Sequence, residues 1–141
     1  MGRILAIDYG RKRSGIAVTD PLQIIANGLT TVASHELLAF IKQYTQKEKV
    51  DAFVIGMPKT LNNEASENQK YIKPFLGNLK KEFPAMPVYE IDERFTSSIA
   101  HQTMIDGGLG KKARQDKALV DTISATIILQ SYLEQKNNFL L

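Results

Sequence analysis

ILAIDYGRKRSGIAV, at residues 4–18, is the stretch that decides how the chain folds. Its apolar run at residues 4–7 predicts a buried strand, and the run at 16–18 predicts a second strand that returns beside the first. The lone carboxylate of Asp8 therefore lies at a strand end, next to the basic turn at residues 10–15. Such a carboxylate could hold a divalent cation while the basic residues meet phosphates. Asp and Gly are also ordinary turn residues, so this stretch is equally compatible with a solvated hairpin turn.

The composition is typical of an ordinary globular domain. The 141 residues, 43% of them apolar, suffice for one domain with a genuine core, which we place at residues 1–141. The net charge of +3 is mild, so an anionic partner would have to meet a local basic patch. The chain has no cysteine, so a metal site would use oxygen ligands or the two histidines. Since no apolar window is long enough to span a bilayer, we expect a soluble cytoplasmic protein without a membrane partner.

Periodicity and turn signals predict the remaining elements. We interpret Asn27-Gly28 as a turn that feeds a third strand, Ser34 as the N-cap of a helix, and the tail from Lys136 as frayed or as an interface. Further strands are expected at 50–56 and 88–91, and helices at 34–48, 66–83, 96–105 and from 116 onward. Three meandering strands followed by alternating helices and strands predict an α/β fold, a mixed five-stranded sheet with helices on both faces.

Acidic side chains occur where this fold would gather them. Asp8 ends the first strand, the pair Asp92-Glu93 ends the fifth, and Asp121 lies among apolar neighbours in the last helix. We expect the ends of the first and fifth strands to lie side by side, so that three acids meet without a compensating buried base. Close carboxylates repel one another unless a cation neutralises them, and oxygen ligands suit Mg²⁺ or Mn²⁺. The sequence therefore predicts a metal site, with two ions that would activate water to attack a phosphodiester.

Basic side chains are expected around the same edge of the sheet. They lie in the first turn, just beyond the fourth and fifth strands, and in the glycine-rich segment at residues 106–115. The candidates for phosphate binding are Arg11, Lys12, Lys59, Arg94, Lys111, Lys112 and Arg114. Each of these segments could also be a plain connecting loop, because Gly, Asn and Lys are common in solvated connectors.

Four motifs in order resemble one known family over almost the whole chain. They are DYGRKRSGIA at residues 8–17, VIGMPK at 54–59, DERFTS at 92–97 and KALVD at 117–121. They are similar to motifs of the YqgF family of RNase H-like nucleases, whose members are also described as Holliday-junction-resolvase-like and as nucleases for pre-16S rRNA. The resemblance implies an RNase H-like fold and a metal site formed by Asp8, Asp121 and the acid at the fifth strand end. We favour Glu93 over Asp92 as that third ligand.

The resemblance implies a divalent-metal-dependent nuclease that processes the 5′ end of pre-16S rRNA. We expect it to act in the cytoplasm as a monomer or weak homodimer. Its partner would be structured nucleic acid, either precursor rRNA or branched DNA. One alternative is a Holliday junction resolvase, which would need a dimer to cut two strands symmetrically. Another is a non-catalytic RNA-binding module. The first turn also fits the phosphate turn of sugar kinases and actin-like ATPases, but those proteins pair two such domains around the nucleotide. A glycosidase would also use paired carboxylates, but the chain has no Trp to form a sugar platform.

Overall fold

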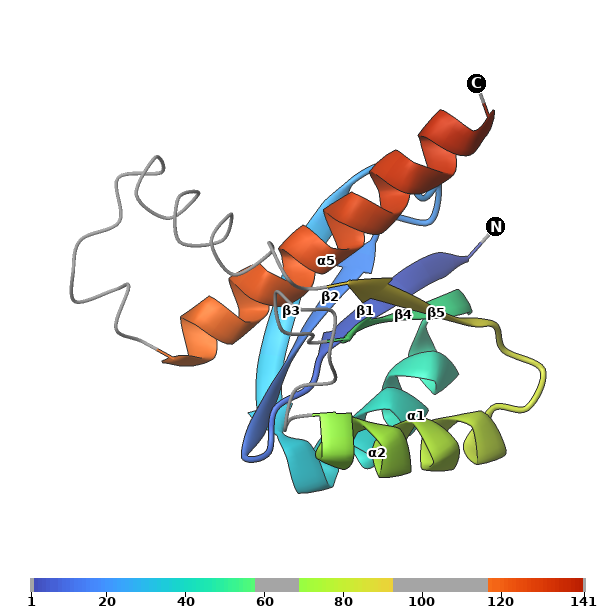
Figure 1. The fold of residues 1–141 in the computed structure, drawn as a ribbon. Helices are drawn as coiled ribbons and strands as arrows, with labels where there is room; N and C mark the ends of the chain where they lie inside the picture. Colours follow the sequence, from blue (N-terminus) through green and yellow to red (C-terminus); the bar gives the residue numbers. More distant parts are fainter. Residues whose placement is uncertain (1, 58–68, 93–116, 141) are drawn as a thin grey trace.

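The central strand of the sheet is β1, which has neighbours on both sides (Figure 1). The structure is a computed structural model that describes residues 2–57, 69–92 and 117–140. Its strands are β1 (Arg3–Asp8), β2 (Arg13–Thr19), β3 (Ala26–Ala33), β4 (Val50–Met57) and β5 (Val88–Asp92). Its helices are the 3₁₀ turn η1 (Ser34–Glu36), α1 (Leu37–Lys47), α2 (Gln69–Glu82) and α5 (Lys117–Leu140). The elements expected at residues 96–115 lie outside the described residues.

The five strands form one mixed sheet in the order β3-β2-β1-β4-β5. Strands β1, β2 and β3 pair antiparallel, which confirms the predicted meander, whereas β4 and β5 run parallel to β1. The carboxyl ends of β1, β4 and β5 consequently share one edge. Our expectation that the ends of β1 and β5 lie side by side was wrong, because β4 lies between the two strands. One side of β1 is already taken by β2, so each successive crossover adds its strand further out on the other side.

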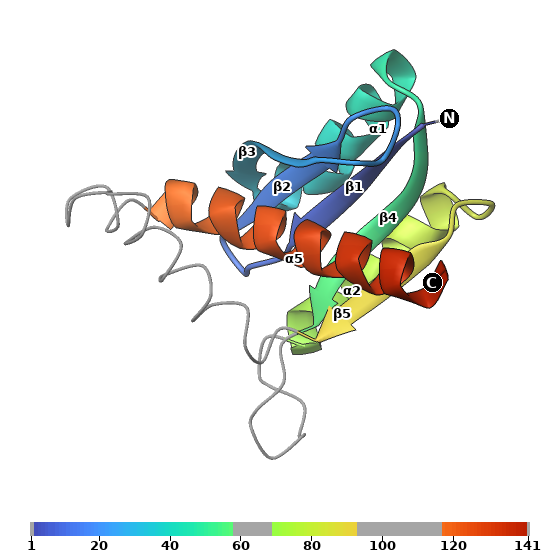
Figure 2. The same cartoon turned by 90° about the horizontal axis from the view of Figure 1, so that it is seen from above.

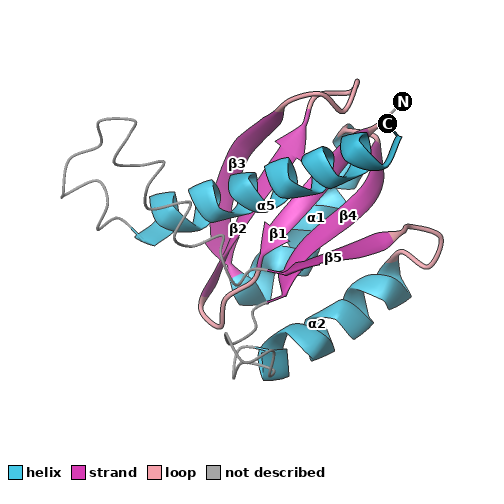
Figure 3. Cartoon of the chain, turned by 45° about the horizontal axis from the view of Figure 1, so that its top comes forward, coloured by secondary structure: helices cyan, strands magenta, loops and turns pink. Residues whose placement is uncertain are grey.

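Helices cover both faces of the sheet, as predicted (Figures 1 and 3). Because strand side chains alternate, Leu5 and Ile7 of β1 face α1 and α2, whereas Ile4 and Ala6 face α5. All four residues are at most 1% exposed. The α5 side of the core also contains Ala17, Val54, Ile91, Ala125, Ile128, Leu129 and Leu133. Helix α5 lies across this face of the sheet (Figure 2), and it continues to Leu140, past Lys136 where we expected a frayed tail or an interface.

Two local predictions from turn chemistry were wrong. Asn27-Gly28 is part of β3 and not a turn, because Gly28 lies under α5, where a Cβ would come within 2.7 Å of Thr122 Cγ2. Ser34 is not an N-cap but the first residue of η1, and no side chain caps η1 or α1. Its buried hydroxyl instead hydrogen-bonds Ser14 Oγ at 2.8 Å and donates to the carbonyl of Gly10. Ser34 therefore fastens the first turn of the chain to the start of η1.

The turn between β2 and β3 is built around Asp20. Its carboxylate accepts hydrogen bonds from the backbone amides of Leu22, Ile24 and Ile25 at 2.8–3.1 Å. Gln23 adopts a left-handed φ of 59°, and its side-chain amide donates to the carbonyl of Gly2 at 2.7 Å. The side chain of Gln23 therefore points toward the start of the chain, and the large apolar side chains of Leu22, Ile24 and Ile25 are exposed.

No helix within the described ranges has the length and hydropathy needed to cross a bilayer.

Replacing Asp20 should change how stability depends on acid. The hydrogen bonds to its carboxylate, led by the one from Ile25, lower the pKa of Asp20 below its ordinary value of 3.8. A carboxyl whose pKa is lower in the folded state contributes stability above its unfolded pKa, and this is lost as pH falls through the folded pKa. Asp20→Asn keeps an oxygen acceptor but loses the charge, so its melting temperature should fall less than that of wild type below about pH 4. Identical acid dependence of the two proteins in thermal melts would contradict this role.

Candidate functional site

Asp8 ends the central strand on the face that α5 covers. Ile4 and Ala6 pack against α5, and strand alternation places Asp8 on the same side. In the register of β1 with β2, its direct cross-strand partner is Gly15. Directly opposed residues of an antiparallel pair present their side chains to the same face, so the face beside Asp8 at this position is free of side-chain atoms from β2. Asp8 itself is partly buried.

Gly15 allows the backbone of α5 to rest directly on the sheet. A Cβ at this position would collide with the carbonyl group of Asp121 and come within 3.0 Å of the amide nitrogen of Thr122. The same part of α5 is fastened to β3, because the hydroxyls of Thr31 and Thr122 hydrogen-bond at 2.6 Å. Asp8 and Asp121 therefore flank the same glycine, one across the strand pair and the other above it. The contact brings the backbone of Asp121 onto the strand position opposite Asp8.

Asp121 is paired with a base that the sequence analysis did not place there. Arg13 Nε donates to Asp121 Oδ2 at 2.7 Å, with side chains that are 36% and 24% exposed, respectively. We expected no compensating buried base, and Arg13 is a partly exposed base that pairs with Asp121. Strand alternation contained the signal, because Arg13, Gly15 and Ala17 share the face of β2 that carries α5. The sequence alone did not show that Asp121 would lie within reach of Arg13.

The basic turn between β1 and β2 packs against the first turns of α2. The guanidinium of Arg11 lies 5.0 Å from the ring centroid of Tyr71, and its Nη1 donates to the Tyr71 hydroxyl at 3.2 Å. The ring of Tyr9 stacks on Phe75 at 5.0 Å. Arg11 and Lys12 are nevertheless exposed. The turn thus presents two cations to solvent beside the strand end that carries Asp8.

The remaining predicted site residues are only partly covered by the structure. Asp92 is the last residue of β5, at the same edge of the sheet as Asp8. The residues that lie outside the described ranges are Lys59, Glu93, Arg94, Lys111, Lys112 and Arg114. Within the described ranges no group of three acidic, histidine or cysteine side chains is arranged to hold a metal ion. Asp8 and Asp121 each carry carboxylate oxygens, the donors that Mg²⁺ and Mn²⁺ prefer.

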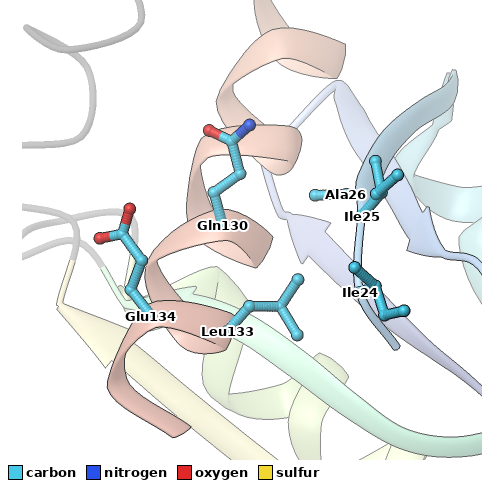
Figure 4. A pocket seen from close by; sticks show the side chains of 6 residues that line it. All are labelled: Ile24, Ile25, Ala26, Gln130, Leu133 and Glu134. Carbon is cyan, nitrogen blue, oxygen red and sulfur yellow. The ribbon is translucent and has the colours of Figure 1, made fainter. Parts of the chain in front are cut away.

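A groove of about 400 Å³ lies at the opposite end of the sheet, between the turn after β2 and the last turns of α5 (Figure 4). It is lined by Ile24, Ile25, Ala26, Gln130, Leu133 and Glu134. This lining contains no cation, and the carboxylate of Glu134 would repel a phosphate. The groove is therefore unsuited to the backbone of a nucleic acid, in contrast to the edge that carries Asp8.

Comparisons with known proteins agree with this geometry. A family model described as "RuvX: Holliday junction resolvase" matches residues 2–135. A protein of Bacteroides thetaiotaomicron is 67% identical over 136 residues, which cover 96% of this chain and 99% of that protein. One of Porphyromonas gingivalis is 58% identical over 134 residues, which cover 95% and 97%. Both carry the name "Putative pre-16S rRNA nuclease".

Solved structures show the same fold at low sequence identity. Thermus thermophilus RuvC in complex with a Holliday junction substrate superposes with a TM-score of 0.58 and 17% identity, covering 96% of each chain. A second structure of Thermus thermophilus RuvC gives a TM-score of 0.57 and 15% identity over the same shares of the two chains. The mixed sheet with helices on both faces is therefore the RNase H-like fold that the motifs predicted.

Gly15→Ala should separate α5 from the sheet and destabilise the protein. The new methyl group meets backbone atoms of Asp121, which cannot move aside as a flexible side chain can. Overpacking of this kind costs about 1–3 kcal/mol of unfolding free energy, measured by urea denaturation. Gly77→Ala is the matched control, because a Cβ at this exposed position in α2 meets nothing within 4 Å. It should stabilise the protein by about 0.5–1 kcal/mol. Equal stability of Gly15→Ala and wild type would show that the contact is not tight.

Proposed function

Because the chain belongs to the RuvX Holliday junction resolvase family, we propose that it is a hydrolytic nuclease whose site is formed around Asp8 and Asp121. The observation that carries this proposal is the contact of α5 with Gly15, which sets Asp121 beside the end of β1. Two carboxylates at the rim of an apolar interface repel each other unless a cation lies near them. Outward from them, Arg11 and Lys12 offer cations to a polyanion.

We further propose that the carboxylates bind Mg²⁺ or Mn²⁺, with two ions at the site. The third ligand is Glu93 and the alternative is Asp92. Asp92 is the last residue of β5, and Glu93 follows it outside the described residues. Divalent ions held there would activate the attacking water and stabilise the leaving oxygen of a phosphodiester. The chain's own contribution is to hold Asp8 on a central strand and Asp121 on a packed helix.

The proposed substrate is the 5′ end of pre-16S rRNA. Its support is the name carried by relatives that are 58–67% identical and cover almost the whole chain, whereas the likeness to a junction-bound resolvase is one of fold at 17% identity. Arg11 and Lys12, together with Lys59, Arg94, Lys111, Lys112 and Arg114, are the proposed phosphate contacts. Such a substrate places the protein in the cytoplasm, where it would act as one domain, a monomer or a weak homodimer.

Removing either carboxylate should abolish cleavage without unfolding the protein. We expect Asp8→Asn and Asp121→Asn to cut a precursor rRNA fragment at least about 100-fold more slowly than wild type in Mg²⁺ or Mn²⁺. Each variant loses a carboxylate ligand of the ion that stabilises charge in the transition state. Glu36→Gln, an exposed acid of η1, is the control and should cleave like wild type. Full activity of either aspartate variant would refute the proposed site. Unchanged RNA affinity and biological function in both variants would instead support the RNA-binding module.

The same assay distinguishes a nuclease for precursor rRNA from a Holliday junction resolvase. A four-way DNA junction offered beside the precursor RNA tests substrate preference directly. Preferred cleavage of the junction, together with a stable dimer in analytical ultracentrifugation, would favour a resolvase, since two active sites are needed to cut two strands. Preferred cleavage of the RNA by a monomer would favour the ribosomal role.

Neutralising Lys12 should weaken nucleic-acid binding in a salt-dependent way. Each phosphate contact releases counterions. Lys12→Gln should therefore make the negative slope of log K against log salt shallower by about 0.7–0.9. Lys42→Gln is the matched control, because Lys42 pairs with Glu82 at 2.8 Å between α1 and α2. Its slope should equal that of wild type in fluorescence-anisotropy titrations. An unaltered slope in Lys12→Gln would remove this residue from the interface.

A further inference from the structure

The ion pair of Arg13 with Asp121 occupies the carboxylate on which the proposed metal site depends. Arg13 Nε lies 2.7 Å from Asp121 Oδ2, a distance typical of a strong charge-assisted hydrogen bond. A guanidinium and a divalent cation on the same carboxylate repel each other, and both interactions cannot reach full strength. Arg13 thus partly neutralises the carboxylate of Asp121.

The surroundings of Arg13 allow its side chain to move. It is the first residue of β2, directly after the exposed turn with Arg11 and Lys12. Its side chain is 36% exposed, so the guanidinium can leave Asp121 and remain in contact with water or with an anion. The long arginine side chain and its planar donors also suit a phosphate, which they can bind through two parallel hydrogen bonds.

We propose that Arg13 is an exchangeable counter-ion: it holds Asp121 while the site lacks a divalent cation, and it turns to a phosphate of the nucleic acid when the cation binds. This inference rests on the proposed function, since it assumes that Asp121 is a metal ligand. Arg13 is accordingly a positioning residue for Asp121. By linkage, nucleic acid that engages Arg13 raises the affinity of the site for the cation, and the cation raises the affinity for nucleic acid by the same factor.

Titration of the protein with Mn²⁺ alone, by calorimetry, tests the exchange without any cleavage. Arg13→Gln should bind Mn²⁺ about threefold or more tightly than wild type, because no ion pair has to be broken. Arg11→Gln is the charge-matched control from the same turn, and Arg13→Lys keeps the charge. Both should differ less from wild type than Arg13→Gln does. If Arg13 only orients Asp121, Arg13→Gln will instead bind Mn²⁺ more weakly, which would overturn the proposal.

Two further results separate failure of this inference from failure of the metal site. If Mn²⁺ affinity is unchanged in Arg13→Gln but lost in Asp121→Asn, the metal site stands and the exchange is refuted. If wild type binds no Mn²⁺, both are refuted. Thermal melts give a second readout, because Mn²⁺ should raise the melting temperature of Arg13→Gln more than that of wild type. If the role of Arg13 is purely structural, the melting temperature of Arg13→Gln will lie below that of wild type by the same amount with and without Mn²⁺.

The second half of the exchange can be tested in buffer with a chelator. Asp121→Asn frees Arg13 from its charged partner, so its RNA affinity should rise and its salt slope should increase by up to about 0.7–0.9. Loss of a repelling carboxylate would raise affinity as well, so the double variant Arg13→Gln/Asp121→Asn completes a mutant cycle. A gain that disappears in the double variant supports phosphate contact by Arg13. A gain that persists in full would show that Arg13 does not reach the nucleic acid.

Discussion

The close packing of α5 on Gly15 is the contact on which the rest of the site depends. A side chain at this position would hold the helix away from the sheet, since its Cβ would meet the backbone of Asp121. The antiparallel register puts Gly15 opposite Asp8, so this contact sets the backbone of Asp121 on the strand pair at the end of β1. The apolar part of the same interface, from Ala125 to Leu133, anchors α5 along the strands. Core packing therefore positions the chemistry.

Electrostatics at this contact follow from its place at the rim of the core. Carboxylates that are partly withdrawn from water need a cation, and Arg13 supplies one to Asp121. The same hairpin carries Asp8, Arg11 and Arg13 within a few residues of one another. Strand alternation and the turn direct these side chains to different sides of the sheet. Arg13 faces α5, whereas Arg11 packs on Tyr71 of α2. The two arginines of one hairpin therefore lie against opposite layers of the fold, and Arg13 is the one paired with Asp121.

Much of the fold could be predicted from periodicity, because strands of alternating or buried character and amphipathic helices leave clear patterns. The strand ends at Asp8 and Asp92 and the unusual placement of Asp121 followed from the same patterns. Contacts between distant segments could not be predicted. The Arg13–Asp121 pair joins residues 108 positions apart, and Asn27-Gly28 has turn chemistry although α5 makes it a site of close packing. The position of β4 between β1 and β5 likewise depends on crossover order, which local sequence does not encode.

The central claim is that Asp8 and Asp121 share a divalent cation at the carboxyl end of β1. A crystal structure of the protein soaked in Mn²⁺, with the ion located by its anomalous signal, tests this claim most directly. We predict density for Mn²⁺ between the carboxylates of Asp8 and Asp121, with oxygen ligands at about 2.0–2.2 Å and Arg13 turned away from Asp121. Density for Mn²⁺ elsewhere, with the Arg13–Asp121 ion pair intact, would contradict it.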